Sequence, residues 1–129
     1  MDADRTGWEL GWSMPCPGVV VCRVTGDVDG ERRAAVEELF AAAVDYADRL
    51  VLVDFSQVGF CDSSGVNTVL ALRLEAHARG VVVCVAGITA AVARVFQLTG
   101  ANTVVLVYDS VSSALADLPE LLATPSTAA

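Results

Sequence analysis

Apolar runs separated by helical patterns are the feature that most constrains the fold of this chain. Runs rich in valine and leucine occupy residues 19–25, 50–55, 81–85 and 103–107. Between them, apolar residues recur every three or four positions, which is the spacing of an amphipathic helix. Strands that alternate with helices form parallel sheets through right-handed crossovers, and continuous apolar strands are buried on both faces. The sequence therefore predicts an α/β fold.

The N-terminal segment predicts an antiparallel addition to this sheet. Apolar and polar or small residues alternate over positions 8–14, the period of a half-buried strand, and residues 15–18 have the composition of a turn. We expect Trp8 and Trp12 to pack on the sheet, because aromatic side chains carry large buried areas in cores. The whole sheet is predicted to be mixed but mostly parallel, with about five strands and about four helices.

Capping residues and apolar spacing set the predicted helices. The first helix is expected to face the core with Val36, Leu39, Phe40, Ala43 and Ala47. The second begins near residues 62–66, ends at Gly80, and is expected to turn Val66, Val69, Leu70 and Leu74 inward. Thr89 and Gly100 bound the third helix, and a final helix follows Ser110 and meets Pro119.

Size and composition indicate one domain and bound its partners. The chain has 129 residues, enough for one sizeable core, and we expect a domain over residues 7–122 with flexible ends at 1–6 and 123–129. No apolar run is long enough to cross a bilayer and the acidic start does not resemble a signal peptide, which predicts a cytoplasmic protein. The net charge of −8 disfavours nucleic acid or an anionic membrane and favours a basic protein surface as partner.

Cysteine, histidine and lysine usage argues against common cofactor chemistry. The four cysteines form no C-x-x-C pair, and the single histidine, His77, has no second histidine at metal-binding spacing, so we expect no metal and no cofactor. All eight basic residues are arginine, which removes P-loop and Schiff-base lysines. Cys22 and Cys84 lie in valine-rich runs and are predicted to be buried thiols. Cys61 is the candidate for reactivity and redox sensing.

The stretch Asp62-Ser63-Ser64-Gly65 lies where a buried strand gives way to a helix. A residue here can cap the helix, carry a phosphate or attack a substrate, since a helix start offers unpaired N–H groups and a field suited to anions. Functional groups in α/β folds gather at the carboxyl ends of parallel strands. Asp27 and Asp29 follow the neighbouring strand, so we expect them to share one rim with these serines.

Catalysis by these serines is disfavoured, and the chain is predicted not to be an enzyme. Ser63 and Ser64 do not lie in a G-x-S-x-G elbow. His77 falls roughly 20 Å further along the same predicted helix, at 1.5 Å per residue, too far to act as a base. No glycine-rich phosphate-binding loop or dinucleotide fingerprint is present either.

Five segments carry a resemblance to a known family, namely residues 24–29, 51–60, 62–66, 80–83 and 92–100. In order and spacing they resemble the STAS domain of bacterial anti-sigma factor antagonists, and the resemblance covers about residues 7–118. It implies that Ser63 is phosphorylated by a partner that is both serine kinase and anti-sigma factor. The unmodified form would bind this partner and release a sigma factor, and a PP2C-type phosphatase would reverse the modification. The partner-binding residues on this reading are Asp27, Asp29, Asp62, Ser63, Ser64, Gly65 and Asn67.

A second hypothesis remains open from the sequence. The chain would then be a STAS-type accessory subunit of a transporter or stress-signalling complex, and Ser63 would only belong to a helix cap. The tryptophan-bearing first strand, the Pro15-Cys16-Pro17-Gly18 turn and Cys61 directly before Asp62 depart from the pattern of the antagonists. The sequence supports no prediction of the oligomeric state.

Overall fold

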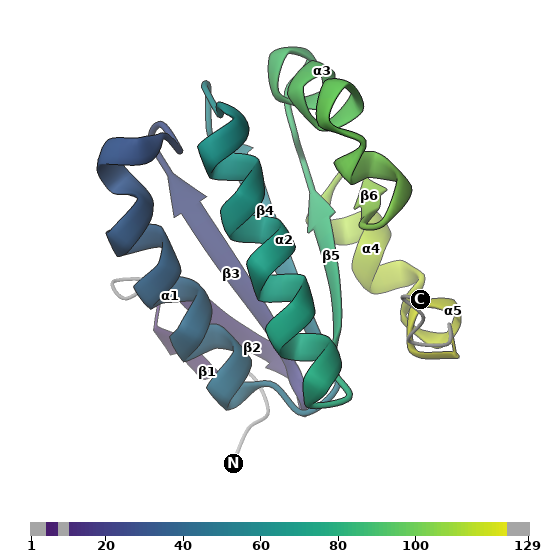
Figure 1. The fold of residues 1–129 in the computed structure, drawn as a ribbon. Helices are drawn as coiled ribbons and strands as arrows, with labels where there is room; N and C mark the ends of the chain where they lie inside the picture. Colours follow the sequence, from purple (N-terminus) through teal and green to yellow (C-terminus); the bar gives the residue numbers. More distant parts are fainter. Residues whose placement is uncertain (1–4, 8–10, 124–129) are drawn as a thin grey trace.

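The described chain forms one mixed sheet in which the strands follow their order in the sequence (Figure 1). The computed structural model describes residues 5–7 and 11–123. Antiparallel pairing joins the first three strands, and parallel pairing joins the third to the sixth. The strands are β1 (Arg5–Gly7), β2 (Trp12–Cys16), β3 (Val19–Thr25), β4 (Leu50–Gln57), β5 (Val82–Ala86) and β6 (Leu106–Tyr108). The predicted α/β fold with a mostly parallel sheet is confirmed, with β1 as an additional edge strand.

Helices cover both faces of the sheet, more fully on one side. Three long helices, α1, α2 and α3, cover one face, and α4 and α5 cover part of the other (Figure 1). The helices are α1 (Arg33–Tyr46), α2 (Ser63–Ala78), α3 (Ala90–Thr99), α4 (Val111–Ala116) and α5 (Leu118–Ala123), with short 3-10 turns η2 (Gly30–Arg32) and η3 (Ala101–Thr103). This layering buries β3, β4 and β5 between helices, as their apolar sequences require.

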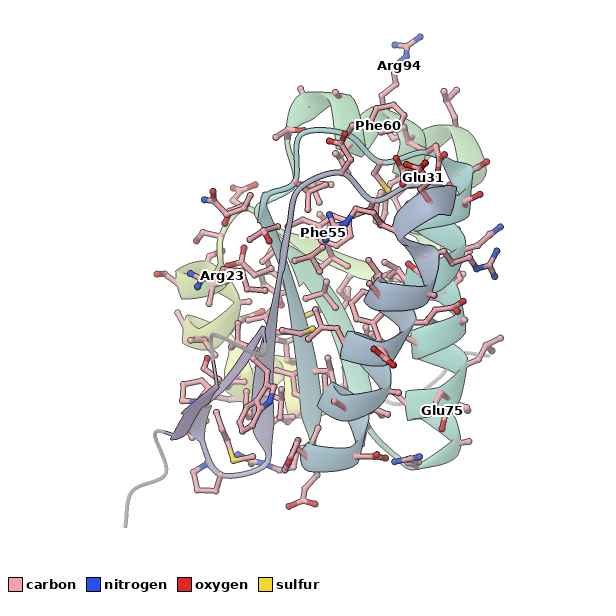
Figure 2. The ribbon with its side chains drawn as sticks, turned by 90° about the vertical axis from the view of Figure 1, so that its left-hand side faces the viewer. Arg23, Glu31, Phe55, Phe60, Glu75 and Arg94 are labelled. Atoms are coloured by element: carbon pink, nitrogen blue, oxygen red, sulfur yellow. The ribbon has the colours of Figure 1, made fainter. Side chains whose placement is uncertain are left out.

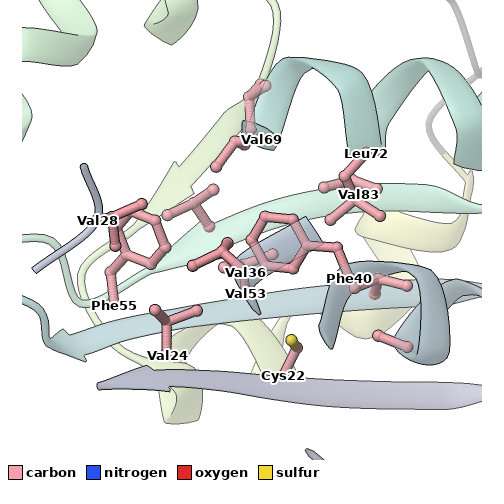
Figure 3. Packing of buried hydrophobic residues seen from close by; sticks show 14 of the residues in the cluster. Cys22, Val24, Val28, Val36, Phe40, Val53, Phe55, Val69, Leu72 and Val83 are labelled. Carbon is pink, nitrogen blue, oxygen red and sulfur yellow. The ribbon is translucent and has the colours of Figure 1, made fainter. Parts of the chain in front are cut away.

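The main core lies between the sheet and the three long helices (Figure 3). Phe55 of β4 and Phe96 of α3 meet edge to face with ring centroids 6.3 Å apart, an arrangement that aromatic quadrupoles favour. Cys22 and Cys84 are fully buried free thiols, as predicted. Burial, with the charge of Asp54 as a smaller cause, raises the pKa of Cys22 to about 12.

The N-terminal hairpin forms as predicted but turns later. Trp12 is 7% exposed and stacks on Tyr46 of α1 with ring centroids 4.7 Å apart, so this tryptophan packs on the sheet. β2 continues through Cys16, and the turn is confined to Pro17 and Gly18, where the glycine has φ +79°. Trp8 and Leu10 lie outside the described residues, as do residues 1–4 and most of the predicted tail, 124–129.

The inward face of α2 differs from the prediction. Leu74 is 64% exposed, whereas Leu72 is 4% exposed and packs in the core with Val66, Val69 and Ala76. The inward residues follow steps of three, three and four, which is the helical stripe. Leu74 falls five residues after Val69 and is therefore rotated out of it.

The C-terminal elements also differ from their predicted bounds. The last strand, expected over residues 103–107, begins later, at Leu106, and Thr103 belongs to η3 instead. Gly100 ends α3 with φ +78°, and Thr103 Oγ1 donates a hydrogen bond back to the Gly100 carbonyl at 2.7 Å. The expected single final helix is two helices, divided at Asp117. Pro119 is the second residue of α5, where a missing N–H costs nothing.

Candidate functional site

Two loops at the carboxyl ends of β3 and β4 are held together by backbone hydrogen bonds. Gly26 N donates to Gln57 O at 3.2 Å, and Val28 N donates to Phe60 O at 2.9 Å. Val28 O in turn accepts from Asp62 N at 3.3 Å, which completes a short parallel bridge between Val28 and Cys61. The acidic loop, residues 26–31 after β3, therefore lies directly beside the start of α2, at the carboxyl ends of the two parallel strands.

The close approach of the two loops restricts position 65 to glycine. A Cβ added at Gly65 would lie 2.4 Å from Val28 O and 2.7 Å from Cys61 Sγ. These distances are shorter than van der Waals contact, and one of the atoms belongs to a hydrogen-bonded backbone. Thr68, which is 1% exposed, donates from Oγ1 to the Gly65 carbonyl at 2.6 Å and secures the first turn of α2. Only glycine fits between the loop and the helix.

Asp62 caps α2 and leaves Ser63 facing solvent. Its backbone is extended, with φ −100° and ψ −174°, and its Oδ1 accepts from Gly65 N at 3.0 Å. Ser63 is the first residue of the helix and is exposed, while Ser64 is half-buried. Asn67 is exposed one turn further on, on the face of α2 that Ser63 occupies. The predicted cap is confirmed at Asp62, and the hydroxyl of Ser63 is presented at the positive end of the helix dipole.

The acidic loop is shaped by Arg32, which sequence reasoning missed. Its Nη1 donates to Thr25 O at 2.6 Å and to Asp27 O at 2.7 Å, and its backbone N is capped by Asp29 Oδ1 at 3.1 Å. The guanidinium lies so close to Gly26, whose φ is +85°, that a Cβ there would be 2.6 Å from Nη1. Asp27 is exposed, whereas Asp29 is half-buried in its capping role.

Cys61 lies beneath the site rather than on its surface. Its side chain is 2% exposed, and burial, with a smaller contribution from the Asp62 charge, raises its pKa to about 11. These surroundings favour the thiol, whereas a reactive cysteine needs a stabilised thiolate. The geometry assigns Cys61 to packing against Gly65 and gives no support to the expected redox role.

Three further observations on the described residues concern a possible catalytic base, metal ligands and membrane-spanning helices. His77 is near the far end of α2, fourteen residues after Ser63, which is about 21 Å along the axis at 1.5 Å per residue. Within residues 5–7 and 11–123, no three histidine, cysteine or carboxylate side chains gather as metal ligands. No helix in those ranges combines the length and apolarity needed to cross a membrane.

The fold and the site define an α/β domain that presents a capped helix start beside an acidic loop. The family model described as the STAS domain matches residues 16–114, which is most of the chain and includes both loops and α2. The chain belongs to the STAS domain family.

Solved structures with this fold come from both signalling and transport proteins. An anti-sigma factor antagonist from Mycobacterium paratuberculosis has a TM-score of 0.68 and 26% identity, over 79% of this chain and 86% of that one. The Bacillus cell fate determinant SpoIIAA in its phosphorylated form has a TM-score of 0.62 and 22% identity, covering 83% and 96%. The STAS domain of a SulP transporter from Vibrio cholerae has a TM-score of 0.65 and 22% identity, covering 86% and 88%. Comparison with curated proteins found no match.

Replacing Gly65 by alanine is expected to destabilise the domain. The added Cβ meets the Val28 carbonyl and Cys61, so the free energy of unfolding should fall by about 1–3 kcal/mol, the usual cost of overpacking. Urea unfolding followed by circular dichroism measures it. Gly59→Ala is the matched control, because a Cβ at Gly59 would have nothing within 4 Å. Equal stability of the two variants would contradict the close packing at Gly65.

Alkylation should distinguish the cysteines by burial. In the folded protein near neutral pH, we expect iodoacetamide to modify Cys61 much more slowly than the half-exposed Cys16, because its thiol is buried and its pKa is about 11. Peptide mass spectrometry gives the rates, and the urea-unfolded chain, in which all four cysteines should react alike, is the control. Modification of Cys61 as fast as Cys16 would restore its redox role.

Proposed function

We propose that the chain is an anti-sigma factor antagonist that phosphorylation of Ser63 switches off. The unphosphorylated form binds an anti-sigma factor that is also a serine kinase, and this releases a sigma factor in the cytoplasm. A PP2C-type phosphatase restores the binding form. The supporting observation is the exposed Ser63 hydroxyl at a capped helix start, directly beside an acidic loop in a STAS domain. The role is one of binding, with no catalytic step by this chain.

A phosphate at Ser63 would change charge more than shape. Phosphoserine adds about −1.5 to −2 charge at neutral pH. This charge would stand next to Asp62 and near Asp27, on a chain that already carries a net charge of −8. A partner interface at this rim would then face a larger desolvation cost, while the start of α2 could hold the phosphate without refolding.

The proposed partner-binding residues divide into two roles. Asp27, Ser63 and Asn67 are exposed and can contact a partner directly, and the half-buried Ser64 borders them. Asp29, Asp62 and Gly65 instead fix the backbone, through two caps and one close approach. Substitution in the first group should affect binding, and substitution in the second should affect stability as well.

The accessory-subunit hypothesis is the second candidate, supported by the likeness to a transporter STAS domain. Ser63 would then serve only as the first residue of a helix that Asp62 already caps. Pull-down from the native cell separates the two candidates. Recovery of transporter subunits, with Ser63→Ala and Ser63→Asp both neutral for that binding, would favour this alternative.

Phosphorylation assays test the antagonist function directly. After incubation with the cognate serine kinase and ATP, mass spectrometry should find the phosphate on Ser63, and Ser63→Ala should stay unlabelled. Ser63→Asp should bind the kinase at least about tenfold more weakly than wild type, about 1.4 kcal/mol of binding free energy, because it places negative charge in the interface. Ser112→Asp, which adds the same charge at an exposed position of α4, is the matched control. A label elsewhere, or equal weakening by both substitutions, would contradict the switch.

A further inference from the structure

Phe60 stands out among the phenylalanines of the chain. Its side chain is 51% exposed, whereas Phe40, Phe55 and Phe96 are at most 3% exposed. It lies three residues before Ser63, at the end of the molecule that also bears Glu31 (Figure 2). Single exposed apolar residues are common on protein surfaces. Phe60 is distinguished by its place, because it lies on the loop that leads into Ser63.

The backbone holds the ring in this outward position. Phe60 O accepts the hydrogen bond from Val28 N at 2.9 Å, so the residue is tied to the acidic loop. Val58, two residues before it, is 1% exposed and Cys61, directly after it, is 2% exposed, and both belong to the main core. An aromatic group presented on such a fixed backbone loses little conformational entropy when a partner covers it.

Other exposed large apolar residues of the described chain lie elsewhere. Tyr46 stacks on Trp12 and is explained by that contact. The rest belong to α2 beyond its first two turns, to the end of α3, or to the segment that includes β6, namely Leu74, Leu98, Val104, Leu106 and Val107. Phe60 is thus the exposed apolar residue that belongs to the loop leading into Ser63.

We propose that Phe60 is the aromatic anchor of the partner interface and inserts into an apolar pocket of the anti-sigma factor, bordered mainly by basic side chains. Anchors of this kind carry much of the binding energy in interfaces. The basic border follows from the exposed carboxylates of Asp27 and Glu31 on the same rim, although Arg94 also projects from this end (Figure 2). The inference rests on the proposed function. It also explains the switch, because a phosphate three residues away would raise the cost of removing water from around the ring.

Binding of truncated variants to the purified serine kinase that phosphorylates the wild-type chain tests this anchor. By calorimetry, Phe60→Ala should raise the Kd about 30-fold, the effect typical of a hot-spot residue. Leu98→Ala, which truncates a side chain that is 74% exposed on α3, is the control and should stay within twofold. Melting temperatures are measured alongside. If Phe60→Ala unfolds early, Phe60→Leu decides, since it keeps the fold and should still weaken binding by losing the ring.

The outcomes separate the anchor from the switch. If Phe60→Ala, or Phe60→Leu where needed, binds within threefold of wild type while Ser63→Asp still binds weakly, the anchor is wrong and the switch stands. If no serine kinase of the source genome binds the wild-type chain, the proposed function fails and the anchor fails with it. Weak binding by both Phe60→Ala and Ser63→Asp, with Leu98→Ala binding like the wild type, supports the anchor and the switch together.

Discussion

The pairing of Val28 with the segment around Cys61 is the interaction on which the site depends. Two hydrogen bonds to the Val28 backbone join the acidic loop to the residues that lead into α2. The Val28 carbonyl also occupies the space that a side chain at Gly65 would need. Because β3 and β4 are adjacent and parallel, both loops leave the sheet at the same rim and reach each other over a short distance. The exposed serine, the acidic loop and the outward phenyl ring are all placed by this one contact.

This construction suits a switch that acts through charge. The strands beneath the site are buried on both faces, Asp62 caps the helix start, and Arg32 holds the acidic loop by two carbonyl contacts. A rim that is already fixed can receive a phosphate without rearranging the core, since packed cores resist continuous deformation. In the proposed mechanism the phosphate changes the cost of covering the rim, and a partner that needs a desolvated phenyl ring and paired carboxylates detects the difference.

The sequence predicts the features that depend on periodicity and on short-range capping. Apolar runs and helical spacing predicted the α/β fold. The residue types of Asp62 and Thr89 predicted helix caps, and both caps are present in the structure. The last strand begins later than predicted because the left-handed Gly100 leads into a 3-10 turn, which has no apolar signature. Arg32 and Phe60 were missed for another reason. Their roles depend on where a side chain points relative to a loop that is distant in sequence, and composition carries no such information.

In the proposed mechanism the rim is already formed before phosphorylation, and the phosphate alters only its charge. Comparison of ¹H–¹⁵N NMR spectra of the ¹⁵N-labelled chain before and after phosphorylation at Ser63 tests it most directly. If the phosphate changes charge alone, shifts will be confined to residues 26–32 and 58–68, and the amides of β3, β4 and α3 will be unchanged. Shifts spread through those strands and α3 would contradict it, because they would mean that the phosphate acts by rearranging the core.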